Sequence, residues 1–397
     1  MSRESGKEWR KLMVIGHRGS GMNLMNSSAP DSTLINSIKE NSILSFNSAA
    51  AFPIDYVEFD VQFFSSFLGD RVGFSGRVRW LVACLSFFPA DRQRVGLNMS
   101  SHESSHVTKD DCPVIFHDNF ILTKDKGIIV EKRISEITLD EFLSYGPQKQ
   151  PGMVGKPLFR KTKDWRIFEW KVENDDSLCT LEEAFQKVEH SVGFNIELKF
   201  DDNIVYKVEE LAHVLEAVLK VVNEYAMDRP IIFSSFQPDA AQLIRKLQNT
   251  PPVYFLTNGG SEVYADVRRN SLDEAIKLCL EGGLQGLVSQ VKAIFRNPGM
   301  ITRIKESKLR LITYGQLNNV PEVLYMQHLM GVEGVIVDFV QEITEAVSDY
   351  IHPAEEGEEN SLFEEDGERR AQARKKPQFS QRQLSFLLKL IPELIQH

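Results

Sequence analysis

Short apolar runs alternate with longer amphipathic stretches along most of the chain, from Lys11 to about Tyr350. The short runs are rich in β-branched and aromatic residues, which is typical of buried strands. Strands that alternate with helices pack as a parallel sheet with the helices outside, so the pattern predicts an α/β fold. The candidate strands are 13–15, 56–61, 114–116, 193–198, 231–234, 253–256, 286–288, 309–314 and 334–337.

The length and regularity of this alternation favour a closed (β/α)8 TIM barrel over an open doubly wound sheet, although alternation alone does not separate the two. Nine candidate strands compete for eight barrel positions, so one of them is wrong or lies outside the barrel. Helices are predicted between the strands, where apolar residues recur at three- and four-residue intervals. They span 41–51, 180–188, 208–225, 238–247, 271–280 and 321–330.

Two segments break the alternation and divide the chain. Residues 11–350 form the predicted barrel domain, but residues 63–106 within it are rich in Phe, Ser and Arg and follow neither a strand nor a helix period. We treat this stretch as an irregular insertion. Beyond the barrel, residues 351–379 have the composition of a charged linker, in which a run of Glu gives way to Arg and Lys.

The end of the chain, residues 380–397, predicts an amphipathic tail helix. Leu384, Leu387, Leu388 and Ile391 fall on one helical stripe. We expect this stripe to dock on the barrel or to pair with a second copy of the chain as a homo-oligomer. Binding to a membrane surface is the less favoured alternative, because the polar face is only weakly basic.

Composition narrows the class of function. The formal net charge of −10 and the absence of a dense basic cluster argue against nucleic-acid binding. The four cysteines form no C-x-x-C pair, so neither a zinc knuckle nor a disulfide framework is indicated. No apolar run approaches the roughly 20 residues of a transmembrane helix. The first twelve residues lack a secretory pattern, so we expect a cytoplasmic protein acting on a small molecule, with a plastid or another organelle left open.

Acidic side chains on two predicted strands point to a cation. Glu58 and Asp60 are two residues apart on one strand and therefore share a face. Glu197 and Lys199 do the same on what we number the fourth strand. Burying an unpaired carboxylate costs several kcal/mol, so we expect a bound ion or a basic partner nearby. Ligation by oxygen alone suits Mg²⁺ or Ca²⁺; the alternative is an internal salt-bridge network.

Two histidines follow other strands at the same predicted rim. His17 and Arg18 lie between glycines after the first strand, and His117 comes directly after the strand 114–116, which we place third in the barrel. Barrel enzymes carry their active sites at this end of the strands. Two histidines allow the general base and the general acid to be separate groups, and the planar fork of Arg18 suits phosphate oxygens.

Taken together, these motifs resemble the glycerophosphodiester phosphodiesterase family. Its pattern is met by His17-Arg18-Gly19, Glu40-Asn41-Ser42, Glu58-Phe59-Asp60, His117-Asp118, Glu197-Leu198-Lys199 and Phe233-Ser234-Ser235-Phe236. The six motifs occur in the family's order, and the stretch 313–319 resembles the eukaryotic, plant-like branch.

The resemblance implies a TIM barrel of the phospholipase C-like phosphodiesterase type and a hydrolase of lipid and glycerol metabolism. Glu58, Asp60 and Glu197 would hold a divalent metal ion, Mg²⁺ or Ca²⁺, while Arg18 and Lys199 neutralise the substrate phosphate. His17 and His117 would be the catalytic acid/base pair, with Glu40 and Asn41 in secondary roles. The expected reaction is hydrolysis of glycerophosphodiesters, such as glycerophosphocholine and glycerophosphoethanolamine, to sn-glycerol 3-phosphate and an alcohol.

The insertion departs from the family pattern. Excising residues 63–106 would join Gln62 to Val107 and restore the family's expected run from Glu58 to Asp118. We therefore hypothesise that the segment is translated non-coding sequence or an alternative splice product. Two other functions stay open: an impaired barrel that serves as a binding protein, and a lysophospholipase D-like hydrolase.

Overall fold

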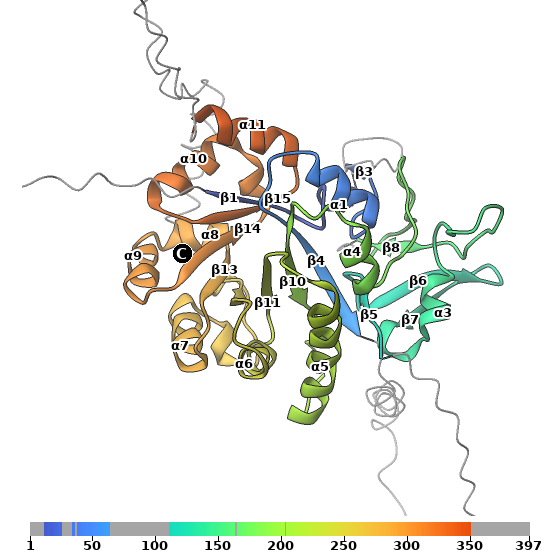
Figure 1. The fold of residues 1–397 in the computed structure, drawn as a ribbon, viewed down its shortest axis with the longest axis horizontal. Coiled ribbons are helices and arrows are strands. Elements are labelled where there is room, and N and C mark those ends of the chain that lie inside the picture. The colour runs from blue at the N-terminus through green and yellow to red at the C-terminus, as the bar shows by residue number, and fades with distance from the viewer. Residues whose placement is uncertain are drawn as a thin grey trace, which may run out of the picture.

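The computed structural model describes residues 12–25, 34–35, 38–63, 111–162, 165–202 and 204–350. Eight parallel strands close into a barrel in these ranges, because β1 pairs with both β15 and β4. In barrel order the strands are β1 (Met13–Gly16), β4 (Tyr56–Phe63), β10 (Gly193–Leu198), β11 (Ile231–Ser235), β12 (Val253–Thr257), β13 (Gly286–Gln290), β14 (Arg310–Tyr314) and β15 (Gly334–Val337). The predicted (β/α)8 TIM barrel is confirmed (Figure 1).

Helices surround the barrel on its outer side (Figure 1). They are α1 (Ile43–Ala50), α4 (Leu181–Lys187), α5 (Val208–Tyr225), α6 (Pro238–Leu247), α7 (Leu272–Gly282), α8 (Val291–Arg296), α9 (Gly299–Glu306), α10 (Pro321–Met330) and α11 (Val340–Tyr350). Local sequence explains several of their starts: Thr180 and Glu183 form a capping box before α4, and Pro238 opens α6 at a position that needs no amide hydrogen. The predicted helices did not include α8, α9 or α11.

An extension of short strands stands beside the barrel. It contains β5 (Pro113–Ile115), β6 (Phe120–Asp125), β7 (Ile128–Arg133), α3 (Leu139–Leu143), β8 (Phe159–Lys161) and β9 (Ile167–Glu169), with the short helix η2 (Ile134–Glu136). Figure 1 shows these elements on the right of the barrel. A separate apolar cluster holds them together, centred on Phe116, Phe142, Tyr145 and Trp170. A small hairpin pairs β2 (Leu24–Met25) with β3 (Leu34–Ile35).

The ninth candidate strand lies outside the barrel, which corrects the strand numbering. β5 covers much of the predicted strand 114–116, and it pairs antiparallel with the end of β4. β10 takes the next barrel position instead, parallel to β4 over six residue pairs. Glu197 therefore lies on the third barrel strand and not the fourth, and His117 belongs to the extension and not to a barrel strand. A three-residue apolar run carries no signal of the direction in which it pairs.

Side chains alternate along each barrel strand between the helices and the barrel interior. On β4, Val57, Phe59 and Val61 join the main core beneath the helices. The residues between them therefore face inward, and the same alternation applies along β10. A smaller layer of apolar side chains fills the barrel interior, including Ile15, Leu256, Ile312 and Ile336. The polar chemistry sits above this apolar layer, at the carboxyl ends of the strands.

None of the helices in the described ranges combines the length and the apolarity that crossing a bilayer requires. The linker 351–379 and the tail helix 380–397 lie outside the described residues, as does the insertion except for Phe63, the last residue of β4. Those predictions stay predictions.

Candidate active site

Three carboxylates from two neighbouring strands meet at the mouth of the barrel. The register pairs Glu197 of β10 with Asp60 of β4. One carboxylate oxygen from each of Glu58, Asp60 and Glu197 lies within 4.8 Å of the others, and all three residues are buried. The sequence prediction that these three acids converge is therefore correct. Their spacing suits a shared cation.

The charges around the trio differ from one carboxylate to the next. Burial, followed by the negative charge of Asp60, raises the pKa of Glu58 to about 8. Burial also disfavours the charged form of Asp60, but Arg18 and Lys199 outweigh it and hold the pKa of Asp60 well below its usual range. Among the residues that the structure describes, the Oε1 atom of Glu58 has no hydrogen-bond partner.

These observations fit a divalent metal ion. A buried carboxylate oxygen without a partner is costly unless a cation or a hydrogen bond satisfies it. Glu58, Asp60 and Glu197 offer oxygen ligands alone, which is the donor set that Mg²⁺ and Ca²⁺ prefer.

His17 projects into the site from the turn that follows β1. Its Nδ1 lies 2.7 Å from Oδ1 of Asp338, and its Nε2 lies 3.9 Å from Oε2 of Glu58. Burial lowers the pKa of His17, but the Asp338 carboxylate more than offsets this and the pKa is raised. The turn requires glycine at position 19, where φ is +91° and a Cβ atom would lie 2.4 Å from Oγ of Ser45.

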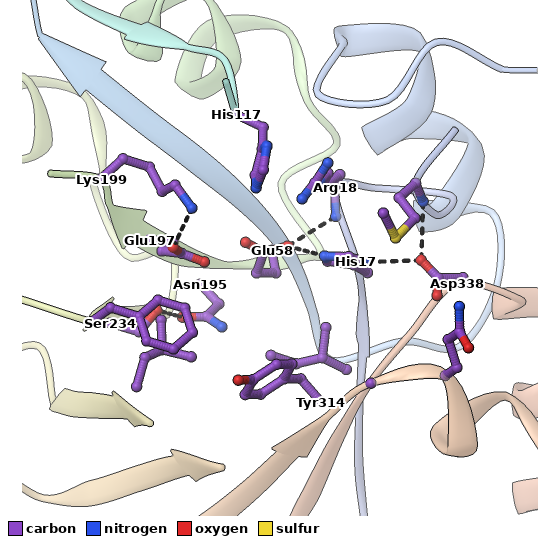
Figure 2. A pocket seen from close by; sticks show the side chains of 16 residues that line it. His17, Arg18, Glu58, His117, Asn195, Glu197, Lys199, Ser234, Tyr314 and Asp338 are labelled. Carbon is purple, nitrogen blue, oxygen red and sulfur yellow. Dashed lines mark hydrogen bonds and ion pairs between the residues drawn. The ribbon is translucent and has the colours of Figure 1, made fainter. Parts of the chain in front are cut away.

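His117 enters from the extension, and its ring points into the same cavity between Lys199 and Arg18 (Figure 2). Its Nδ1 lies 2.6 Å from Oδ1 of Asp118. Burial lowers the pKa of His117, and the positive charges of Arg18 and Lys199 lower it further. The two imidazoles thus each have a carboxylate on Nδ1, which leaves Nε2 for chemistry.

Arg18 and Lys199 supply positive charge beside the acids. Nη1 of Arg18 donates to Oε1 of Glu40 at 2.6 Å, and its Nε lies 3.3 Å from Oδ2 of Asp60. Nζ of Lys199 donates to Oε1 of Glu197 at 2.8 Å and lies 3.5 Å from Oδ1 of Asp60. The predicted cations are therefore at the site, and both line the cavity.

Glu40 and Asn41 support the site from behind. Nδ2 of Asn41 donates to Oδ2 of Asp60 at 2.8 Å. Burial works against the charge of Glu40, but Arg160 and Arg18 lower its pKa to about 2. Both residues are buried, and neither is among those that line the cavity. They therefore lie behind the residues that line the cavity, and their secondary role stays a prediction.

Three supporting residues were missed by the sequence analysis. Asp338 holds His17, and Arg160 joins Glu40 (Nη2 to Oε1, 2.8 Å) to Asp118 (Nε to Oδ2, 3.2 Å). Nε2 of Gln62 lies 3.1 Å from the carbonyl oxygen of His117 and 2.8 Å from that of Asp118. Gln62 alone carried a signal, because it follows Glu58 and Asp60 at the same two-residue spacing.

A cavity of about 250 Å³ opens above the trio. Figure 2 shows the charged residues on one side of it and Ser234, Asn195 and Tyr314 on the other. Apolar side chains of Phe236, Leu256 and Ile336 also line it. Two imidazoles, two cations and a trio of carboxylates beside one cavity can bind a phosphate ester and exchange protons with it.

The sequence matches a known family over most of its length. The profile of the Glycerophosphoryl diester phosphodiesterase family matches residues 17–65 and 105–342. The matched ranges contain all nine site residues predicted from the sequence. The unmatched residues between them, 66–104, fall within the predicted insertion.

Individual relatives extend the match. The chain is 52% identical over 394 residues to Arabidopsis thaliana glycerophosphodiester phosphodiesterase GDPD1, chloroplastic, covering 99% of this chain and 93% of the relative. It is 53% identical over 385 residues to GDPD3 of the same plant, covering 97% and 91%. A solved Oleispira antarctica phosphodiesterase, in complex with the product sn-glycerol-3-phosphate, superposes with a TM-score of 0.50 at 17% identity, covering 85% and 96%. That likeness shows the shared fold.

Proposed function

The chain belongs to the glycerophosphoryl diester phosphodiesterase family, and from this premise we propose that it hydrolyses glycerophosphodiesters with the help of a divalent ion. The substrates proposed are glycerophosphocholine and glycerophosphoethanolamine, and the products are sn-glycerol 3-phosphate and the free alcohol. One observation carries the proposal. A buried trio of carboxylates, one oxygen of which has no partner among the described residues, lies beside two histidines. Both histidines line one cavity together with Glu58 and Glu197 of the trio.

His17 and His117 share the proton transfers. A glycerol hydroxyl of the substrate attacks its own phosphorus, and one imidazole accepts the hydroxyl proton as the new O–P bond forms. The other imidazole donates a proton to the departing alcohol oxygen as the second P–O bond breaks. Water then opens the cyclic phosphate with the two imidazoles in reversed roles, so one water is consumed for each substrate.

The remaining site residues bind the phosphate, orient the imidazole rings and would hold the metal ion. Arg18 and Lys199 offset the negative charge of the phosphate, and Asp338 and Asp118 fix the two rings by accepting from Nδ1. Glu58, Asp60 and Glu197 would hold Mg²⁺ or Ca²⁺. When bound, such an ion orients the attacking hydroxyl and stabilises charge on the phosphoryl oxygens.

A coupled assay of sn-glycerol 3-phosphate release tests the proposal. The full chain is assayed with glycerophosphocholine and glycerophosphoethanolamine, first with EDTA and then with excess Mg²⁺ or Ca²⁺. We expect no release with EDTA and recovery with one of the ions. Release that persists in EDTA would exclude the metal-dependent mechanism. Failure to release product with either ion would favour the binding-protein alternative, and faster choline release from lysophosphatidylcholine would favour the lysophospholipase D-like alternative.

The insertion needs its own comparison. The family profile leaves 66–104 unmatched, which supports the idea that residues 63–106 interrupt a family sequence. The same assay on a variant without these residues measures their effect, and sequencing the transcript across the junction tests their origin. Finding only transcripts that contain the segment would contradict a splicing origin.

We also propose a cellular compartment and an oligomeric state. The sequence predicts a cytoplasmic protein, whereas one relative is named chloroplastic, so we propose the cytosol or the plastid. A fluorescent fusion distinguishes them. Pairing of two chains through residues 380–397 is tested by comparing the mass in solution of the full chain with that of a chain ending at residue 379.

A further inference from the structure

One polar side chain on the cavity wall has no place in the mechanism so far. Asn195 lies on β10, is fully buried and lines the cavity of the active site. Its Nδ2 has no hydrogen-bond partner in any described part of the chain. A buried amide group that donates to nothing is unusual in a folded protein. Because it faces a cavity, a bound molecule can supply the missing acceptor.

The neighbouring strand fixes which end of the amide faces the cavity. Oγ of Ser234 on β11 donates to Oδ1 of Asn195 at 3.1 Å, and Ser234 is itself buried. With Oδ1 engaged, the NH₂ group is the end left for a ligand (Figure 2). An amide NH₂ group donates hydrogen bonds and does not ligate cations. The NH₂ group of Asn195 is therefore suited to donate to an oxygen of the substrate and is not suited to bind the metal ion.

The depth of Asn195 in the barrel indicates which part of the substrate it meets. Asn195 pairs in register with Glu58 on β4 and precedes Glu197 by two residues, so it lies on the same inward face. The main chain of Lys199 lies four residues later, roughly 13 Å further along at about 3.3 Å per residue, and its Nζ reaches back to donate to Oε1 of Glu197. A phosphate between Arg18 and Lys199 thus lies closer to the rim than Asn195, and the carbon arm of the ester extends toward Asn195.

We propose that Asn195 binds the glycerol arm of the substrate by donating a hydrogen bond from Nδ2 to the oxygen of its 2-hydroxyl. This inference rests on the proposed function. The hydroxyl oxygen accepts from Asn195 while its own hydrogen stays available to an imidazole, so the contact holds the attacking oxygen without competing for its proton. Ser234 is the positioning residue that keeps the amide in this orientation.

The contact is tested by removing the 2-hydroxyl from the ligand and the amide of Asn195 from the protein, first separately and then together. Three competitive inhibitors are compared on the metal-loaded wild type and on Asn195→Ala: sn-glycerol 3-phosphate, 3-hydroxypropyl phosphate, which lacks the 2-hydroxyl, and 2-hydroxypropyl phosphate, which lacks the terminal hydroxyl. The wild type should prefer sn-glycerol 3-phosphate over the analogue without the 2-hydroxyl by about two- to tenfold, the worth of one neutral hydrogen bond. In Asn195→Ala this preference should fall to about one, while the effect of removing the terminal hydroxyl stays unchanged.

Two further variants separate binding from structure. Ser234→Ala should lose part of the same preference, and Asn195→Ala/Ser234→Ala should be no worse than Asn195→Ala alone. Ser289→Ala is the matched control, because Ser289 is a buried serine on barrel strand β13 and does not line the cavity. It should retain the full preference.

Several outcomes would overturn the inference. A preference for the 2-hydroxyl that survives in Asn195→Ala shows that another group binds it. A raised metal requirement in Asn195→Ala shows that the amide oxygen, turned toward the cavity, ligates the ion. A lower melting temperature with an unchanged preference shows a structural role. If the wild type neither binds sn-glycerol 3-phosphate nor releases it from any substrate, the proposed function itself has failed, and that result is distinct from the other three.

Discussion

The two halves of the active site are built in different ways. The barrel half contains His17, Glu58, Asp60 and Glu197, and the main-chain register of β1, β4 and β10 sets their positions. The extension half contributes His117 from the loop after β5, and that loop is held by side chains. Glu40 links the halves, because it accepts from Arg18 of the barrel turn and from Arg160 of β8.

This difference places the proposed ion ligands and the second imidazole in separate halves. The three proposed ligands all lie on barrel strands, whereas the second imidazole comes from the loop after β5, which contacts Gln62 of β4 and Arg160 of β8. Changes in the two halves should therefore have different signatures.

Removing a proposed metal ligand from the barrel half should have the largest effect. Glu197→Gln keeps the shape of the side chain but removes the charge that it brings to the trio. We expect turnover to fall by more than about 10³-fold, the rate equivalent of losing several kcal/mol of transition-state stabilisation. The measurement is kcat/KM over a range of Mg²⁺ and Ca²⁺ concentrations, with Glu216→Gln on the outer helix α5 as control. Wild-type turnover at ordinary ion concentrations would contradict the ligand assignment.

Removing the imidazole of the extension half should slow the reaction but spare the ion. His117→Gln is expected to lower kcat by about 10² to 10⁴-fold, as loss of a general acid or base does. Its ion affinity, measured by titration calorimetry, should match that of the wild type. A large loss of ion affinity in this variant would show that the two halves are not separable.

Loosening the loop that carries His117 should also lower kcat, but by less than removing the imidazole. Gln62→Ala removes the amide that lies within reach of the carbonyl oxygens of His117 and Asp118. A catalytic group misplaced by about 1 Å can cost up to roughly 100-fold, so we expect kcat to fall about tenfold with KM nearly unchanged. Gln186→Ala, an exposed glutamine on α4, is the control. If KM rises while kcat holds, Gln62 acts on substrate binding instead.

The same division explains what could be predicted from the sequence. Two-residue spacing on a strand and strand ends at one rim placed Glu58, Asp60, Glu197 and His17 correctly, because those positions follow from the barrel itself. His117 was recognised from its motif, but its element was assigned wrongly, since the three residues of β5 carry no sign of antiparallel pairing.

The supporting contacts lay beyond sequence reasoning for another reason. Asp338 meets His17 across 321 positions of sequence, and Arg160 meets Glu40 across 120. Each is a single polar residue without a periodic pattern or motif around it. Only closure of the barrel and packing of the extension bring such pairs together.

Replacing Glu40, which links the two halves, should change the free energy of unfolding more than it changes turnover. The folded-state pKa of Glu40 is about 2, below its ordinary 4.5, because Arg160 and Arg18 outweigh its burial. A lowered pKa stabilises the fold above about pH 4.5, and this contribution is lost as the pH falls toward 2. Glu40→Gln should lower the unfolding free energy at pH 6 by about 3 kcal/mol, since each of the two buried guanidinium groups loses one of its carboxylate partners and keeps only Asp60 or Asp118.

The measurement for Glu40 is urea unfolding of both proteins at several pH values between 6 and 3. The difference between wild type and Glu40→Gln should shrink as the pH falls. A difference that stays constant over this range would show that the ion pairs of Glu40 do not stabilise the fold.

Calorimetric titration of the metal-free full chain with Mg²⁺ and with Ca²⁺ tests whether the three carboxylates form a cation site, because it measures ion binding without relying on turnover. We expect one of these ions to bind with a stoichiometry of one per chain. Glu58→Gln/Glu197→Gln should abolish this binding, and His117→Gln should retain it. Equal binding by the wild type and the double carboxylate variant would contradict the assignment of Glu58, Asp60 and Glu197 as the cation site.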